Sequence, residues 1–161
     1  MRVPIVRIAQ FISSLAIPLA AGAVGSLFTI PAIPTWYAVL VKPFFTPPAW
    51  VFSPVWTVLY ILMGIALYLV WIKGWNDKYV QMAIAIFAIQ LTLNVLWTFL
   101  FFGLHSPFLG LVGILLLWVA IILTVLSFFR VSAGAAILLV PYFVWVSFAA
   151  ILNYAVFVLN P

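Results

Sequence analysis

The side chains able to recognise a ligand lie in three apolar segments, each of which repeats them at helical spacing. Gln90 and Asn94 are four residues apart and Trp97 follows three positions later, so the three share one face of a helix. Two further segments carry similar stripes, which consist of Trp56, Tyr60 and Gly64 in one and of Pro141, Trp145, Ala149 and then Leu152 or Asn153 in the other. Each stripe presents a tryptophan and at least one hydrogen-bonding group.

These stripes have two explanations. The polar amides would bond between helices and only hold a bundle together, each bond contributing about 0.6–2 kcal/mol. Alternatively, Trp56, Trp97 and Trp145 face one another. They would then line an apolar cavity with a few directed polar groups, which is the usual composition of a small-molecule site.

The scarcity of ionisable groups excludes several other kinds of chemistry. The chain has one acidic residue, Asp77, one histidine, His105, and no cysteine, so no metal site of normal ligand number is expected. Acid–base pairs of carboxylates and disulfides are excluded for the same reason. Asp77 and His105 fall in loops predicted on opposite faces of a membrane, about 30 Å apart, and cannot form a catalytic pair.

The composition is that of an integral membrane protein. Of 161 residues, 70% are hydrophobic and only 4% are charged, whereas a soluble domain carries about 25% charged residues. The mean hydropathy of +1.43 agrees. Six basic residues, scattered singly, do not favour nucleic-acid binding and are better explained as a membrane topology signal.

Proline, glycine and charged residues divide the chain into five apolar segments. A span needs about 20 residues, and the segments predict spans at residues 3–28, 49–73, 79–102, 108–129 and 135–159. Continuous apolar runs disfavour a barrel, which needs alternation over roughly ten residues. We therefore predict an all-α bundle of five transmembrane helices that forms one domain over residues 1–161.

The basic residues predict the orientation of this bundle. Five spans place the N-terminus and the second and fourth loops on one side, with the basic residues Arg2, Arg7, Lys73, Lys78 and Arg130. The other side has only Lys42 and His105. By the positive-inside rule, the N-terminus is cytoplasmic, and the first loop and the C-terminus lie on the opposite side.

The first loop, residues 29–48, is long for so small a protein. Its five prolines stiffen the chain, and its aromatic residues seek an apolar surface. The loop is explained either as an aromatic belt on the lipid headgroups or as a semi-rigid lid over a pocket. No acidic residue lies within a span and no internal repeat is visible, so an ion-coupled transporter fits less well.

Three motifs resemble the translocator protein family, whose members are also called tryptophan-rich sensory proteins or peripheral benzodiazepine receptors. The first runs from Trp36-Tyr37 through Lys42-Pro43 and Pro47-Pro48 to Trp50, Phe52, Pro54, Trp56 and Tyr60. The second runs from Gln90 through Leu93-Asn94 and Trp97-Thr98 to Phe101-Phe102-Gly103. The third comprises Pro141-Tyr142, Trp145, Phe148-Ala149 and Leu152-Asn153-Tyr154.

The resemblance implies a five-helix bundle, commonly a homodimer, whose first loop covers a cavity. It implies a membrane receptor-like protein that binds porphyrins such as protoporphyrin IX and haem, or related flat apolar molecules, without a required cofactor. The implied ligand-binding positions are Trp56, Tyr60, Asn94, Trp97, Trp145, Ala149 and Leu152. The implied lid positions are Trp36, Lys42, Pro47 and Pro48, with Lys42 and His105 as the cations available to a ligand carboxylate.

The resemblance also implies a possible activity, the light-dependent breakdown of porphyrin. The matching tryptophans are Trp56 and Trp145, which would either take part in the photochemistry or only stack on the ligand. A transporter or a regulatory scaffold subunit is the alternative function. The cholesterol motif of animal members lacks its basic residue after Leu152 and Tyr154, so tight cholesterol binding is not expected and a prokaryotic member is favoured.

Overall fold

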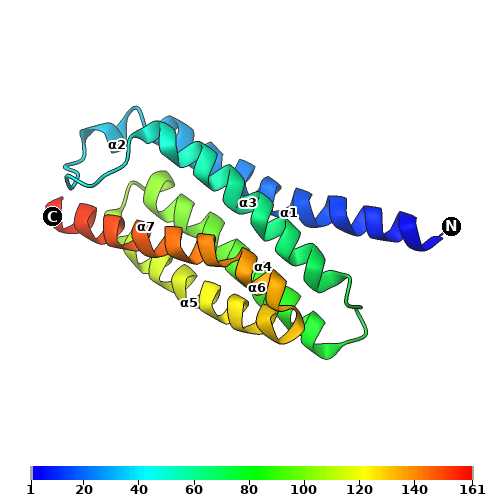
Figure 1. The fold of residues 1–161 in the computed structure, drawn as a ribbon. Coiled ribbons are helices and arrows are strands. Elements are labelled where there is room, and N and C mark those ends of the chain that lie inside the picture. Colours follow the sequence, from blue (N-terminus) through cyan, green and yellow to red (C-terminus); the bar gives the residue numbers. More distant parts are fainter. Residues whose placement is uncertain (1, 161) are drawn as a thin grey trace.

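The computed structural model describes residues 2–160, with side chains from residue 5 onward, and over this range it is helical without strands (Figure 1). The elements are α1 (Arg2–Ala32), α2 (Trp36–Val39), α3 (Ala49–Trp71), α4 (Lys78–Thr98), a π-helical turn η1 (Phe99–Gly103), α5 (Pro107–Val131), α6 (Ala133–Leu138) and α7 (Val140–Leu159). Five helical stretches are long and apolar enough to cross a membrane, at 5–32, 49–71, 78–103, 107–131 and 133–159. The protein is an all-α, multi-pass membrane bundle.

Two of these stretches differ from the expected spans at a proline. Helix α1 continues past residue 28 to Ala32, because Pro31 removes only one backbone donor and Ile33 N–H still donates to the Thr29 carbonyl at 3.0 Å. The last stretch is divided at Leu139, because Pro141 lies in the first turn of α7. The segment that joins α1 to α3, residues 33–48, is called the lid below, and α2 is its one short helix.

Helices α4 and α5 begin at residues whose side chains cap free backbone N–H groups. The Asp77 carboxylate accepts a bond from Tyr79 N–H at 2.8 Å at the start of α4, and Ser106 Oγ accepts one from Leu109 N–H at 3.2 Å at the start of α5. The turn between α3 and α4 contains Gly74 at φ +114°, a conformation that favours glycine. The single acidic residue therefore has a structural role as a helix cap.

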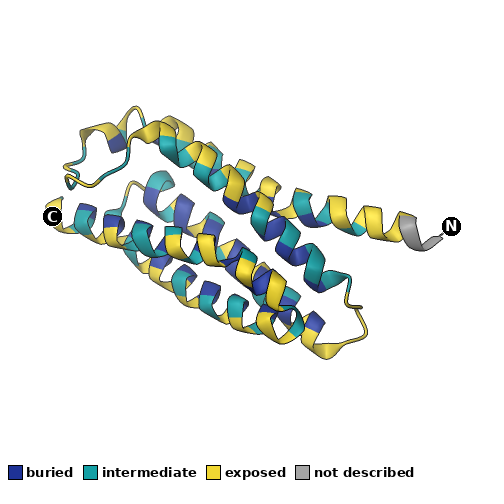
Figure 2. Ribbon diagram, viewed as in Figure 1, coloured by how far each residue is buried: buried dark blue, intermediate teal, exposed yellow. Residues whose placement is uncertain are grey.

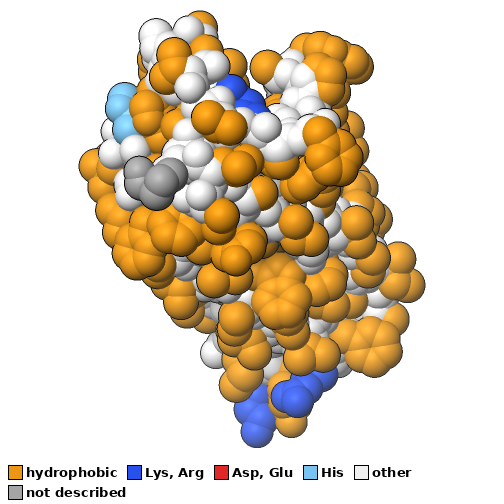
Figure 3. Space-filling model, turned by 90° about the vertical axis from the view of Figure 1, so that its left-hand side faces the viewer, with side chains coloured by type: hydrophobic (Ala, Val, Ile, Leu, Met, Phe, Trp, Pro, Cys, Tyr) orange, Lys and Arg blue, Asp and Glu red, His pale blue; other side chains and the backbone are white. Residues whose placement is uncertain are grey.

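The bundle is hydrophobic outside as well as inside. Its helices turn buried faces toward one another and exposed faces outward (Figure 2), yet the exposed positions include many large apolar side chains such as Ile12, Leu123 and Ile151. Viewed from the end that holds the lid, the surface is mostly hydrophobic, and basic side chains gather at its lower end (Figure 3). A surface of this kind is suited to lipid.

Helix α1 approaches α3 most closely at Gly64. A Cβ atom there would lie 2.8 Å from both Leu15 Cα and the Ser14 carbonyl oxygen. Pro18, one turn further along α1, has no N–H to offer that carbonyl. From this contact toward the lid, α1 and α3 form the two sides of a cavity.

Candidate functional site

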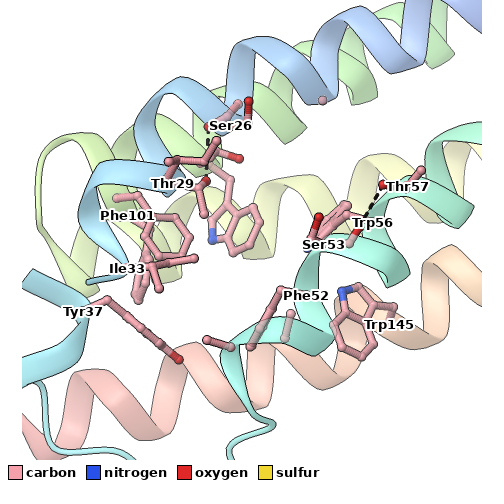
Figure 4. A pocket seen from close by; sticks show the side chains of 18 of the residues that line it. Ser26, Thr29, Ile33, Tyr37, Phe52, Ser53, Trp56, Thr57, Phe101 and Trp145 are labelled. Carbon is pink, nitrogen blue, oxygen red and sulfur yellow. Dashed lines mark hydrogen bonds between the residues drawn. The ribbon is translucent and has the colours of Figure 1, made fainter. Parts of the chain in front are cut away.

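A cavity of about 370 Å³ lies at the lid end of the bundle, between α1, α2, α3, α4, η1 and α7. Six of the seven predicted ligand-binding residues line it, namely Trp56, Tyr60, Trp97, Trp145, Ala149 and Leu152. Figure 4 shows Tyr37 extending from the lid toward Phe52, with Trp145 on the far side. The three stripes seen in the sequence therefore converge on one space.

One wall of the cavity is a group of aromatic rings from α3 and α4. The Trp56 ring lies 5.6 Å from the Tyr60 ring and 5.9 Å from the Trp97 ring, measured between centroids, and is tilted by 31° and 32° to them. Trp97 lies 6.5 Å from Phe101 in a stacked arrangement. This wall presents a broad apolar surface to a flat ligand.

Asn94 differs from the expectation because it lies behind this wall and does not line the cavity. Its Oδ1 accepts a hydrogen bond from the Tyr60 hydroxyl at 2.7 Å, and its Nδ2 donates to the Tyr142 hydroxyl at 3.0 Å. The amide is 1% exposed. Asn94 thus holds Tyr60 in place and does not contact the space that a ligand would occupy.

Trp97 is fixed by a second buried amide. Its indole N–H donates to Asn153 Oδ1 at 3.2 Å, and Asn153 Nδ2 donates to the Pro107 carbonyl at 3.0 Å. The two bonds connect α4, α7 and the start of α5 behind the cavity. Both asparagines of the predicted stripes therefore form hydrogen bonds between helices, as the first explanation of the stripes proposed, and these bonds position aromatic rings. The rings in turn line a cavity, as the second explanation proposed.

Trp145, on the α7 side, differs from Trp97 in its indole nitrogen. Trp145 Nε1 is buried and has no hydrogen-bond partner, one of three such side-chain atoms among the described residues, with Ser14 Oγ and Gln90 Oε1. It is the one of the three whose residue lines the cavity. A buried donor without a partner costs about 1–3 kcal/mol. A ligand with a hydrogen-bond acceptor would relieve this cost once the indole turned to expose the nitrogen to the cavity.

Helix α1 forms a wall that the stripes did not predict. It contributes Gly22, Gly25, Ser26 and Thr29 to the lining. At Gly22 a Cβ atom would lie 2.5 Å from Tyr60 Cε2, so the absence of a side chain makes room for the Tyr60 ring. The run of small residues in this segment was the available signal, although it indicates close helix approach and not a pocket.

The turn η1 adds two consecutive phenylalanines, Phe101 and Phe102, to the lining. Leu104 N–H donates to the Phe99 carbonyl at 2.8 Å, five residues back, which is the π-helical pattern. The wider turn lets both neighbouring rings contact the cavity and the lid, since Tyr37 lies 6.2 Å from Phe101 and 5.8 Å from Phe102. The sequence predicted an ordinary end of a helix here.

The lid residues that line the cavity are Ile33 and Tyr37, and none of the four predicted lid residues does so. Tyr37 lines the cavity and is 8% exposed, and this burial raises the pKa of its hydroxyl above the usual 10.0. Trp36 turns away from the cavity to pack against Phe101 at 5.3 Å and to stack on His105 at 4.9 Å. His105 itself has a positive φ of 53°.

The remaining lid residues shape the lid. Lys42 Nζ donates to the Ala38 and Leu40 carbonyls at 3.2 and 3.1 Å and lies 4.8 Å above the Tyr37 ring. The ammonium thus occupies the carbonyl end of α2, where a positive charge is favoured, and faces away from a ligand. Pro47 and Pro48 lead into α3, with Pro48 at its N-cap position.

Over the described residues, no group of three metal-binding side chains occurs. The site consists of aromatic rings, a few hydroxyl groups and one unpaired indole N–H, enclosed by four of the five membrane-spanning stretches and the lid. This combination defines a membrane receptor-like protein with a ligand-sized apolar cavity.

Comparison with known proteins identifies the particular family. The model of the TspO/MBR family matches residues 14–159, and the chain belongs to that family. It is 52% identical over 143 residues to the tryptophan-rich protein TspO of Chlorobaculum tepidum, covering 89% of this chain and 90% of that protein. It is 48% identical over 155 residues to the TspO protein of Archaeoglobus fulgidus (96% and 99%) and 42% identical over 135 residues to the human translocator protein (83% and 79%).

Proposed function

We propose that this protein binds a porphyrin, such as protoporphyrin IX or haem, or a related flat apolar molecule, in the cavity beneath the lid. The observation that carries the proposal is the convergence of Trp56, Trp97 and Trp145 on one cavity of about 370 Å³. Ligand sites have volumes of about 300–1,000 Å³ and are mostly apolar with a few directed polar groups. The aromatic rings supply an apolar surface for the ligand, and a hydrogen bond to the unpaired Trp145 N–H would fix the ligand's orientation.

The size of a porphyrin determines how it would lie. The macrocycle is larger than the cavity, so one edge must extend out of it. The lining is exposed between α1 and α3, where Ser53 and Thr57 face Ser26 and Thr29 across the opening (Figure 4). In this orientation the ring plane stacks on Trp56, and a carboxylate or other acceptor on the inner edge accepts a bond from Trp145 N–H.

A titration of the detergent-solubilised protein with protoporphyrin IX in the dark tests the proposal. Binding, followed by porphyrin absorbance and tryptophan quenching, is expected to saturate. A Trp56→Phe, Trp145→Phe double variant should bind at least tenfold more weakly, whereas Trp75→Phe, in the exposed turn after α3, should bind normally. Non-saturable quenching, or equal affinities of the two variants, would overturn the proposal.

A second candidate function is light-dependent porphyrin degradation, with light and dioxygen as co-reactants. The observation that favours it is the set of oxidisable rings at short range, since Trp56 lies within 6 Å of both Tyr60 and Trp97. An excited porphyrin stacked there has an indole electron donor at contact distance. Porphyrin bleaching under light and air is compared for the wild type and Trp145→Phe at equal occupancy. Equal bleaching would leave Trp145 as a binding residue only.

The resemblance leaves two alternative functions, transport and a role as a regulatory scaffold subunit. It also implies a homodimer. Uptake of porphyrin into vesicles above a protein-free control would favour transport over reception. Crosslinking in native membranes would test the homodimer.

We further infer that the N-terminus is cytoplasmic. Arg7, Lys73, Lys78 and Arg130 lie at the end of the bundle opposite the lid, and Lys42 lies in the lid (Figure 1). The Arg2 side chain is outside the described side chains.

A further inference from the structure

A single side chain joins the lid to the end of the last helix. Asn160 Oδ1 accepts a hydrogen bond from Val41 N–H at 3.0 Å, and Asn160 Nδ2 donates to the Val41 carbonyl at 3.0 Å. The two residues are 119 positions apart in the sequence. One primary amide thus satisfies both backbone groups of one lid residue, as a neighbouring strand would.

The amide is held in the orientation that this pairing needs. Asn160 Nδ2 also donates to the Val156 carbonyl at 2.8 Å, in the last turn of α7. This bond uses the second amide hydrogen and fixes the side chain to the helix that carries Trp145, Ala149 and Leu152. The lid is therefore tied directly to one wall of the cavity.

The tie acts on the part of the lid that covers the cavity. Val41 lies two residues after α2 (Trp36–Val39), and α2 carries Tyr37 over the cavity. The other end of α2 is held by different contacts, those of Trp36 with Phe101 and His105. The short helix is thus fixed by aromatic packing at its start and by the Asn160 amide just past its end.

Packing gives only partial support at the second of these points. Leu40 packs against the buried cluster of Tyr37, Phe101, Leu152 and Val156, but its two neighbours contribute little. Val39 and Val41 are 81% and 56% exposed, so their side chains bury little apolar surface against the bundle. The Lys42 ammonium binds carbonyls of the lid itself and makes no tie to α7. Further along, Phe45 meets Phe148 of α7 at 6.3 Å, but Phe45 lies four residues beyond Val41, on the other side of Pro43, and does not hold Val41.

We propose that Asn160 is a positioning residue of the ligand site, which latches the lid to α7 so that Tyr37 stays over the cavity. Without the amide, the Val41 end of α2 is held only by the packing of Leu40, so it moves more widely about the Trp36 end and the cavity opens more often toward the membrane surface. The ligand part of this inference rests on the proposed function, whereas the latch itself concerns the unliganded protein.

The latch is tested first without ligand, by spin-label distance measurements. The chain has no cysteine, so Val39→Cys on the lid and Ile151→Cys on α7 provide a clean pair of exposed labelling sites. Asn160→Ala is expected to broaden the distance distribution. Asn160→Asp, which keeps the acceptor for Val41 N–H but loses both donated bonds, should fall between Ala and the wild type.

Thr35→Val is the matched control, because Thr35 Oγ1 donates at 2.7 Å to the Pro31 carbonyl and makes no contact across to α7. It removes a lid hydrogen bond of similar length without touching the latch and should leave the distribution narrow. Equal distributions for Asn160→Ala and the wild type would overturn the proposal. Equal broadening by Thr35→Val would show that any loss of a lid bond suffices and would also overturn it.

The second readout is the rate of protoporphyrin IX dissociation. Loss of the latch is expected to raise this rate about threefold to tenfold, with the thermal unfolding temperature of the bundle unchanged. A broadened lid with an unchanged rate would overturn the positioning role. If the wild type binds no porphyrin, the proposed function fails, while the label distances still decide whether Asn160 holds the lid.

Discussion

Adding one methyl group at Gly22 is expected to displace Tyr60 and to weaken ligand binding. The Cβ atom of Gly22→Ala would lie 2.5 Å from Tyr60 Cε2 and 2.7 Å from Cδ2. The ring must therefore move by about 1 Å to reach an ordinary carbon–carbon contact. It has little freedom to do so, because Tyr60 is buried and its hydroxyl is bonded to Asn94 at 2.7 Å.

The magnitude follows from two terms. Overpacking of a buried site costs about 1–3 kcal/mol, and stretching the Tyr60–Asn94 bond leaves a buried polar group poorly paired, at a similar cost. If the Tyr60 ring relaxes into the cavity, the protein loses less folding stability, but the displaced ring occupies space that the ligand needs and weakens binding. Since 1.4 kcal/mol corresponds to a tenfold change in affinity, we expect protoporphyrin IX affinity to fall about tenfold or more.

The matched control is Gly25→Ala, one turn further along α1 and also in the cavity lining. Its Cβ atom would meet Thr98 Oγ1 at 3.4 Å, an ordinary contact. Dark titrations with protoporphyrin IX and thermal unfolding are measured for both variants. The reasoning is refuted if Gly22→Ala binds and unfolds as Gly25→Ala does, because the ring would then move without cost.

Three further outcomes are expected. Trp145→Phe keeps an aromatic ring but removes the unpaired N–H, so protoporphyrin IX affinity should fall about tenfold in dark titrations, and an unchanged value would mean that no ligand acceptor meets this donor. Burial raises the pKa of Tyr37 above 10.0, so the neutral hydroxyl is favoured in the closed lid. The equilibrium between open and closed lid is then constant below pH 10.0, and closure weakens as the pH rises through the raised pKa, because the Tyr37 hydroxyl of the open lid loses its proton first. Spin-label distances between the lid and α7 measure this pH dependence, and Tyr37→Phe should abolish the pH dependence. A membrane-impermeant maleimide applied to intact cells should label Phe44→Cys in the lid and not Trp75→Cys, and the reverse pattern would invert the orientation.

The spans and the tryptophan-bearing faces of α3, α4 and α7 could be predicted from the sequence because both depend on periodicity. Continuous apolar runs set the five spans, and four-residue spacing placed Trp56, Trp97 and Trp145 on inward faces. Which member of a stripe contacts the cavity depends on depth, and spacing carries no information on depth. Asn94 shares a face with Trp97 but lies deeper, between two tyrosine hydroxyls.

Physical reasons also explain why the sequence did not predict the other walls of the cavity. Helix α1 contributes through glycines and hydroxyls, which indicate close packing in a membrane helix as readily as a pocket. Tyr37 and Trp36 are adjacent aromatics in a loop rich in proline, and their opposite directions depend on the short helix α2. The Asn160–Val41 pairing joins residues 119 positions apart in the chain, and a single sequence contains no signal for it.

The π-helical turn η1 has a consequence for how such a site can change between relatives. A turn of this kind holds one residue more than an α-helical turn, so it is equivalent to a one-residue insertion into a helix that otherwise keeps its bonds. Deleting Leu100 would restore the regular ladder and rotate the following residues by about 100°. One of the two phenylalanines would then leave the cavity, while Trp97 and everything before it stayed in place. A one-residue deletion in this turn would thus change which aromatic rings line the cavity, while the part of α4 that precedes the turn keeps its hydrogen bonds.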